Sequence, residues 1–136
     1  MTKDTLAFDL ASLDTVSRGD SGAELELLHP ATGEGLGVYL TIAGVDSKAW
    51  RRASAAVSEK RTGKRRLTAD DIVAGGIEIL ARCTIAWRSG DKATVVVDAQ
   101  ELTCSVENAR MLFTRFPWAR EQADAWASDR ANYLRD

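Results

Sequence analysis

The sequence is short of the residues that most often carry catalysis or bind metals. Its 136 residues include a single histidine and two cysteines, Cys83 and Cys104, which form no C-x-x-C pair. A structural zinc site takes four nitrogen or sulfur ligands, so we expect no metal and interpret both cysteines as reduced, partly buried thiols. We likewise expect no cofactor.

Long apolar runs and a one-sided charge are also missing. No stretch approaches the ~20 apolar residues of a membrane span, and the opening MTKDTLAFDL lacks the apolar stretch of a signal peptide. The formal net charge is -2, which disfavours a general affinity for nucleic acid or for anionic membranes. We therefore expect a cytosolic protein built as one domain.

The first part of the chain differs in pattern from the rest. Residues 1–22 mix aspartates with scattered apolar positions and end in SRGDSG. We predict a partly ordered arm here, which either forms a short strand or docks on a single domain spanning 23–136. The RGD at 18–20 is interpreted as a chance match.

Alternation then predicts a β-hairpin. In AELELLHP, Leu25 and Leu27 face one side, and LGVYLTIAG places Val38, Leu40 and Ile42 together, with the turn residues ATGEG between the two runs. A third short strand is the default for 94–97, where Val95, Val96 and Val97 follow one another, with a less regular extended segment as the alternative.

Helical patterns fill most of the remainder. Asp46 or Ser47 caps a helix that ends near Arg61, and Thr68 caps a second helix whose apolar pattern continues to Trp87. Two further helices follow, one capped by Ser105 and one that runs from Pro117 to about Leu134. These elements predict an α+β fold, with a small antiparallel sheet packed against about four helices.

Two adjacent glycines interrupt the second helix. Gly75 and Gly76 each cost about 1 kcal/mol relative to alanine in a helix interior. We interpret them as a kink, or as a place where another backbone comes close.

Polar residues give little indication of catalysis. His29 lies at the hairpin turn, and a triad with Asp46 and Ser47 competes with the simpler interpretation that these two residues cap a helix. Asp70 and Asp71 are neighbours on a helix, so their side chains diverge and suit the helix N-terminus. Because no convergent polar set appears, we expect no catalytic residues and no enzyme.

Two clusters are candidates for partner binding. The basic run has three open interpretations, namely a solvated loop, a site for an acidic protein surface, or a site for nucleic acid, the last being disfavoured by the acidic remainder of the chain. The aromatic cluster either closes the core or leaves some rings exposed as anchors for a partner. The basic residues are Lys60, Arg61, Lys64, Arg65 and Arg66, and the aromatic residues are Phe113, Phe116, Trp118, Trp126 and Tyr133.

Short motifs add a family resemblance over residues 23–134. GVDS at 44–47 follows the hairpin, and the chain closes with SVENARMLFTRFPWAREQADAWASDRANYL at 105–134. This pattern resembles the tail assembly chaperones of long-tailed bacteriophages and prophages. The matching positions in the closing segment are Ser105, Glu107, Asn108, Ala109, Phe116, Pro117, Asp129, Arg130, Ala131, Asn132, Tyr133 and Leu134. The arm, the basic run and the valines of 94–97 have no counterpart in it.

The resemblance implies a non-enzymatic assembly factor in the cytoplasm of an infected or lysogenic bacterium. Its partners would be the tape-measure protein and the tail tube protein, and self-association stays open. Two other functions compete. The protein could be a minor tail or tail-completion protein that remains in the virion, or a small DNA-binding regulator that uses residues 60–66.

Overall fold

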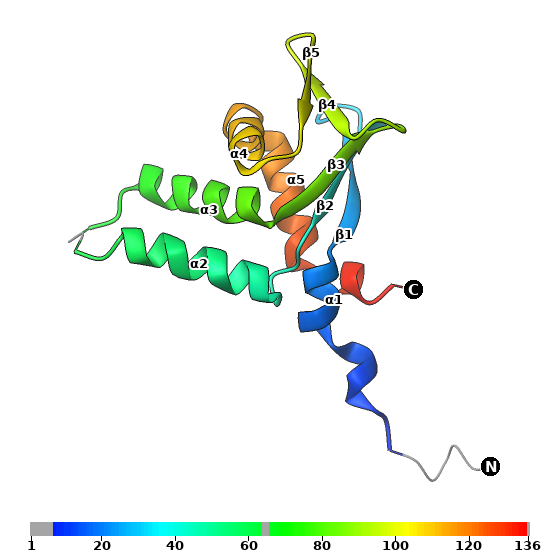
Figure 1. The fold of residues 1–136 in the computed structure, drawn as a ribbon, viewed down its shortest axis with the longest axis vertical. Helices are drawn as coiled ribbons and strands as arrows, with labels where there is room; N and C mark the ends of the chain where they lie inside the picture. Colours follow the sequence, from blue (N-terminus) through cyan, green and yellow to red (C-terminus); the bar gives the residue numbers. More distant parts are fainter. Residues whose placement is uncertain (1–6, 64–65, 136) are drawn as a thin grey trace.

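A computed structural model describes residues 7–63 and 66–135 of the chain. These residues form a three-stranded antiparallel sheet, a separate two-stranded hairpin and five α-helices (Figure 1). The predicted α+β class is confirmed. None of the helices in the described part combines the length and apolarity needed to cross a membrane.

The main sheet has the strand order β1-β2-β3. The predicted hairpin is confirmed as β1 (Ala23–Leu28) and β2 (Gly35–Ile42), and β3 (Thr84–Ser89) pairs with the other edge of β2. Leu25 and Leu40 lie opposite each other in the register, and both side chains are buried. The alternation read from the sequence therefore marks the face that meets the core.

An α-hairpin is inserted between β2 and β3. α2 (Lys48–Lys60) and α3 (Ala69–Cys83) lie side by side, and their shared end projects from the body (Figure 1). Ser47, rather than Asp46, caps α2 by accepting from the amide of Trp50 at 3.0 Å. Thr68 caps α3 as predicted and forms a reciprocal capping box with Asp71.

Two more helices complete the core. α4 (Val106–Arg115) starts at the predicted cap Ser105, and α5 (Pro117–Ser128) starts at the proline. α5 packs against β1 and β2 through Ala119, Ala123 and Ala127, which are all buried. Alanine at every fourth position lets the helix approach the sheet closely.

The prediction for the second helix was wrong at its end, because it included the residues of a strand. Its apolar pattern continues to Trp87, but α3 ends at Cys83 and Thr84–Ser89 is strand β3. The hydroxyl of Thr84 donates to the carbonyl of Leu80 at 2.8 Å, which satisfies one orphan helix acceptor. The open edge of β2 then supplies a ladder of hydrogen bonds that the sequence pattern does not display.

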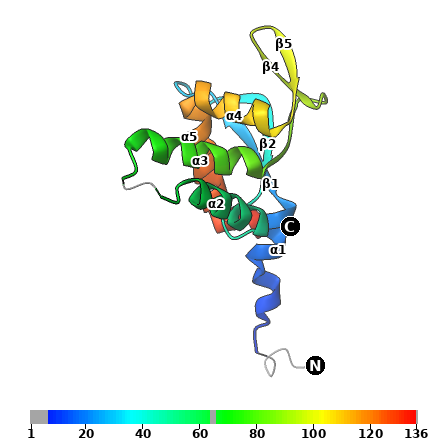
Figure 2. The ribbon, with the colours of Figure 1, turned by 60° about the vertical axis from the view of Figure 1, so that its left-hand side comes forward.

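The valine-rich segment is a strand, as predicted, but it does not join the main sheet. β4 (Thr94–Val97) pairs with β5 (Gln100–Thr103) in a second hairpin (Figure 2). The third strand of the main sheet is β3 instead. Sequence alone missed β5, because QELT at 100–103 has little β-branched or aromatic character.

The predicted last helix is also too long. α5 ends at Ser128, Asp129 is extended, and Arg130–Tyr133 form a 3₁₀ turn. The break turns the chain back so that the Tyr133 hydroxyl donates to the carbonyl of Ile42 at 3.0 Å. An unbroken helix would carry this buried ring away from the sheet.

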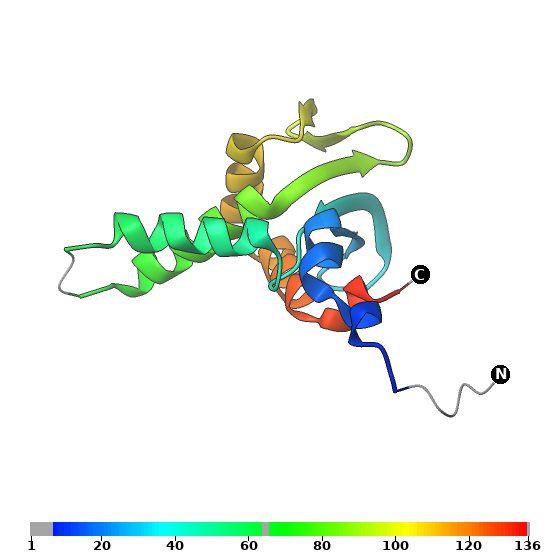
Figure 3. The same cartoon turned by 60° about the horizontal axis from the view of Figure 1, so that its bottom comes forward.

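The N-terminal arm docks as a helix rather than as a strand. After a 3₁₀ turn at Leu10–Leu13, α1 (Thr15–Ser21) lies beside the start of α2 (Figure 3). The amide of Ala49 donates to the Asp20 carboxylate at 3.1 Å. Residues 1–6 of the predicted arm lie outside the described residues.

Candidate binding groove

The residues that carry the family resemblance meet in space at the end of the sheet. Asp46, from GVDS, accepts two hydrogen bonds from the guanidinium of Arg130, from DRANYL, and a third from the hydroxyl of Thr15 at 2.7 Å. Hydrogen bonding to Arg130 lowers the Asp46 pKa to about 2. We call this set, together with Gly44 and Tyr133, the C-terminal clamp.

Packing within the clamp explains its glycine and its tyrosine. The Tyr133 ring lies over Gly44, where an added Cβ would come within 3.0 Å of the ring carbons. Asn132 donates to the carbonyl of Trp126 at 3.0 Å, and Asp129 accepts from the amide of Ala131 at 3.0 Å. The clamp therefore satisfies its own polar groups and leaves none directed at a ligand.

The other half of the resemblance is structural as well. Ser105 accepts from the amide of Asn108 at 3.0 Å, and the Asn108 side chain donates to the carbonyl of Thr103 at 2.8 Å. Ala109 is completely buried. These residues fix how α4 leaves the second hairpin.

The predicted aromatic cluster divides into core and surface residues. Phe113 and Tyr133 are buried, which is the core interpretation and removes them as anchors for a partner. Trp126 is half-buried at the edge of β1, where its ring N–H donates to the carbonyl of Ala23 at 3.3 Å. Phe116 and Trp118 are half-buried at the corner between α4 and α5, with ring centroids 6.1 Å apart.

This corner forms the floor of an apolar groove with a volume of about 180 Å³. The proline sets the corner, because Phe116 adopts φ -120° and ψ 81°, outside the helical region, as predicted for a residue before proline. Val96 and Leu36 on the walls are 56% and 40% exposed. The lining comprises Leu27, Leu36, Val38, Val95, Val96, Val97, Leu112, Phe116, Trp118 and Ala119, and we call it the FPW groove.

The β4–β5 hairpin forms one wall of the FPW groove and is anchored at two places. The Trp87 ring N–H donates to the carbonyl of Leu102 at 2.9 Å, which ties the hairpin to the main sheet. At the tip, the Arg115 guanidinium binds the Asp98 carboxylate through two hydrogen bonds and lowers its pKa. The hairpin is therefore held near its open end and at its tip.

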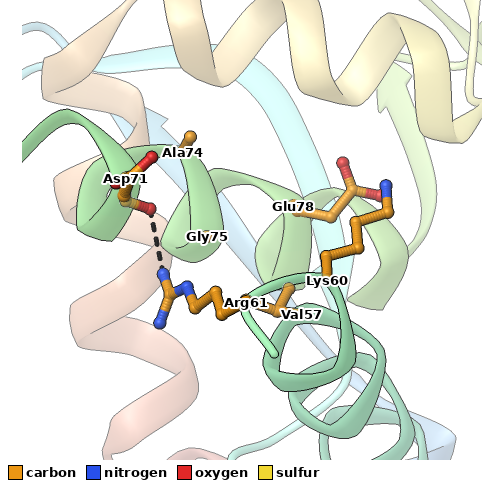
Figure 4. A pocket seen from close by; sticks show the side chains of 7 residues that line it. All are labelled: Val57, Lys60, Arg61, Asp71, Ala74, Gly75 and Glu78. Carbon is orange, nitrogen blue, oxygen red and sulfur yellow. Dashed lines mark hydrogen bonds between the residues drawn. The ribbon is translucent and has the colours of Figure 1, made fainter. Parts of the chain in front are cut away.

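A second hollow lies between α2 and α3, and polar and apolar side chains line it together. Figure 4 shows Arg61 extending from the end of α2 to the carbonyl of Asp71, beside Gly75. An added Cβ at Gly75 would collide with the Arg61 guanidinium, so glycine lets Arg61 keep this position. Glu78, which also lines the hollow, is held by Arg110 and Arg82, and these contacts lower its pKa to about 2. Arg61 and Glu78 are thus engaged by contacts within the described chain.

The predicted basic cluster is only partly a surface feature. Arg61 is half-buried and staples the α-hairpin, whereas Lys60 and Arg66 are exposed and make no ion pair within residues 7–63 and 66–135. Lys64 and Arg65 lie outside the described residues.

The remaining polar candidates have structural roles. The His29 ring nitrogen accepts from the amides of Ala31 and Thr32, so it shapes the hairpin loop, as the simpler interpretation holds. Cys83 is buried, which raises its pKa to about 12, and Cys104 is partly buried. Within the described ranges, no group of three His, Cys, Asp or Glu side chains is placed to hold a metal ion.

Sequence reasoning found the floor of the FPW groove but not its walls. Phe116 and Trp118 were candidates because aromatic residues are frequent in binding sites. The valines of β4 and Leu36 read only as strand residues. The missed signal was the run of three valines, because alternation along a strand turns Val96 away from the side of Val95 and Val97. Comparisons with protein-family models, curated proteins and solved structures found no significant match. The family resemblance therefore depends on the motifs alone.

Proposed function

We propose that this protein is a bacteriophage tail assembly chaperone that holds an apolar helix of the tape-measure protein or of the tail tube protein in the FPW groove. The observation that carries the proposal is the exposed apolar lining at the α4–α5 corner. Soluble domains seldom leave such a concave apolar surface open without a ligand. The clamp motifs support the family part of the proposal, because they fix the frame on which this corner is built.

The dimensions of the groove suit a side chain rather than a large ligand. A 150 Å³ apolar cavity in another protein holds benzene, so about 180 Å³ accommodates one large aliphatic or aromatic group. An amphipathic helix presents such groups at spacings of three and four residues. One anchor residue would enter the FPW groove, and its neighbours would cover Val96 and Leu36.

A reversible contact is what an assembly chaperone requires. Burial of one or two apolar side chains contributes about 1.5–3 kcal/mol each, which is modest against the cost of association. The charges at the rim are neutralised, because Arg115 pairs with Asp98. Binding at this groove should therefore depend little on salt.

The proposal is tested with purified protein and a candidate tape-measure protein from the same genome. Val96→Asp places a charge on the exposed wall of the groove, and we expect its Kd for the tape-measure protein to rise tenfold or more. Ile85→Asp is the matched control, since Ile85 is also an exposed β-branched strand residue but does not line the groove. Equal affinities of the two variants, with both folded, would contradict the proposal.

The two competing functions have separate tests. A minor tail or tail-completion protein would be present in purified virions by mass spectrometry, whereas a chaperone would be absent. A DNA-binding regulator would be retained on heparin and released steeply by salt. With only Lys60 and Arg66 exposed and unpaired among the described residues of the basic cluster, we expect weak retention.

A further inference from the structure

Gly76 is unexplained within the described chain. It lies in the second turn of α3, where glycine costs about 1 kcal/mol relative to alanine. The neighbouring Gly75 is explained by the Arg61 guanidinium that lies against it. At Gly76, by contrast, no described atom outside its own helix and its neighbours lies within 4 Å of the position of an added Cβ. A glycine that makes room for nothing in its own chain suggests that the room is used by another molecule.

The surroundings of Gly76 are apolar and exposed. Ile72 is 58% exposed and Val73 is 42% exposed, and they lie four and three residues before Gly76, so the three positions share one face of α3. Leu67, just before the helix cap, is 38% exposed. Ile79 continues the same stripe and is partly buried against the core. We call Leu67, Ile72, Val73 and Gly76 the α3 face.

This face lies on the projecting part of the α-hairpin. Figures 1 and 3 show that the first half of α3 extends beyond α4, with only α2 beside it. Leu80, Ala81 and Cys83, in the second half of the helix, are buried. The exposed apolar residues are therefore concentrated where the body of the domain does not reach.

Positive charge adjoins the α3 face. Arg66 is exposed next to Leu67 and makes no ion pair within the described ranges, whereas Lys60 lines the hollow on the other side of α3, beside Glu78 (Figure 4). Five other arginines of the described chain, at 82, 88, 110, 115 and 130, are in ion pairs. Asp70 is an exposed acid nearby; it lies on the opposite side of the helix from Ile72 but three residues before Val73, so it borders the α3 face.

We infer that the α3 face docks an acidic amphipathic helix of a partner protein, whose backbone comes close at Gly76. A helix with a small residue at the contact can approach there, while its flanking apolar residues cover Ile72 and Val73. Glutamates or aspartates on the side of this helix that faces the hairpin end would meet Arg66. This surface is separate from the FPW groove and does not depend on the proposed function.

Two designed peptides test the inference on the full-length, ¹⁵N-labelled protein. Both form helices with the same face of alanine and leucine; one carries glutamates on its flanks and the other carries lysines. We expect the glutamate peptide to shift the amide signals of residues 66–79 and leave those of 95–97 unchanged. The lysine peptide should bind at least tenfold more weakly.

Variants identify the face. Gly76→Leu should weaken binding of the glutamate peptide tenfold or more, and Gly76→Ala should weaken it less while raising the melting temperature. Ala55→Leu introduces the same side chain at an exposed position of α2 and should leave the affinity unchanged. Arg66→Glu should lower the affinity for the glutamate peptide and raise that for the lysine peptide. Val96→Asp should affect neither peptide, so failure at the groove and failure here are distinguishable.

Three outcomes would overturn the inference. The first is equal affinity for both peptides. The second is a shift map centred on 95–97. The third is a concentration-dependent shift of residues 66–79 without peptide, accompanied by shifts at the exposed Phe8 and Leu10, which would make a second copy of this chain the occupant.

Discussion

The two ends of α2 show opposite uses of side chains. At its start, the C-terminal clamp joins α1, the β2–α2 junction and the final 3₁₀ turn through Asp46, Arg130 and Thr15, with Tyr133 buried beneath them. At its other end, the α-hairpin projects with exposed Ile72, exposed Val73 and unpaired cations. In the clamp, polar side chains are hydrogen-bonded within the chain, whereas at the projecting end apolar and charged side chains are exposed. The recognisable motifs of the clamp thus have structural roles, and the candidate interface consists of exposed apolar residues that form no recognisable motif.

The largest expected effect comes from the clamp. Tyr133→Ala removes a buried ring and its hydrogen bond to the carbonyl of Ile42, and we expect the free energy of unfolding to fall by about 3–5 kcal/mol. Tyr133→Phe keeps the ring and should cost only about 1 kcal/mol. Urea denaturation of both variants measures the difference. A loss below about 1 kcal/mol for the alanine variant would show that the clamp does not stabilise the fold.

A substitution at the tip of the β4–β5 hairpin should stabilise the protein, in contrast to the loss of stability expected at the clamp. Asp98 and Ala99 have φ angles of 52° and 64°, in the left-handed region that disfavours residues with a Cβ. Ala99→Gly should therefore raise the free energy of unfolding by about 1 kcal/mol, as measured in urea. Ala125→Gly, at an exposed position within α5, is the control and should lower it by a similar amount. Destabilisation by Ala99→Gly would contradict the argument from backbone strain.

Alanine substitutions at the two adjacent glycines of α3 should change stability in opposite directions. Gly75 lies against Arg61, whereas Gly76 faces open space. Gly76→Ala meets no described atom and should raise the free energy of unfolding by about 0.5–1 kcal/mol. Gly75→Ala should lower it, because the Arg61 guanidinium must leave its place and lose its hydrogen bond to Asp71. Thermal unfolding of the pair measures both signs. If both variants shifted the melting temperature in the same direction, the contrast between Gly75 and Gly76 would be wrong.

The smallest effect concerns acid. The pKa of Asp46 is lowered to about 2 in the folded protein, so its ion pair stabilises the fold above the ordinary pKa near 3.8 and is lost as pH falls towards 2. At pH 6, Asp46→Asn should melt a few degrees below the wild type. Between pH 4 and pH 2 this difference in melting temperature should disappear. Because Arg130 is largely exposed, screening keeps this effect small.

Much of the local structure could be predicted from neighbouring residues. Ser47, Thr68 and Ser105 each cap the helix that they precede, and Pro117 starts the next one. The β1–β2 hairpin follows from alternation and turn residues. The candidate groove was predicted only through Phe116 and Trp118, since its walls come from strands whose pairing is not visible in the sequence.

What the sequence by itself determined are the features stabilised within a few residues: caps, turns, the proline corner and the periodic apolar faces. Tertiary structure decided the rest. Residues 84–89 satisfy a helical pattern and a strand pattern equally, and the free edge of β2 selects the strand by offering hydrogen-bond partners. Residues 129–133 leave the helix because the Tyr133 ring gains burial against Gly44 that a straight helix could not provide. In both places, contacts between segments distant in the sequence outweigh a local preference of about 1 kcal/mol per residue or less.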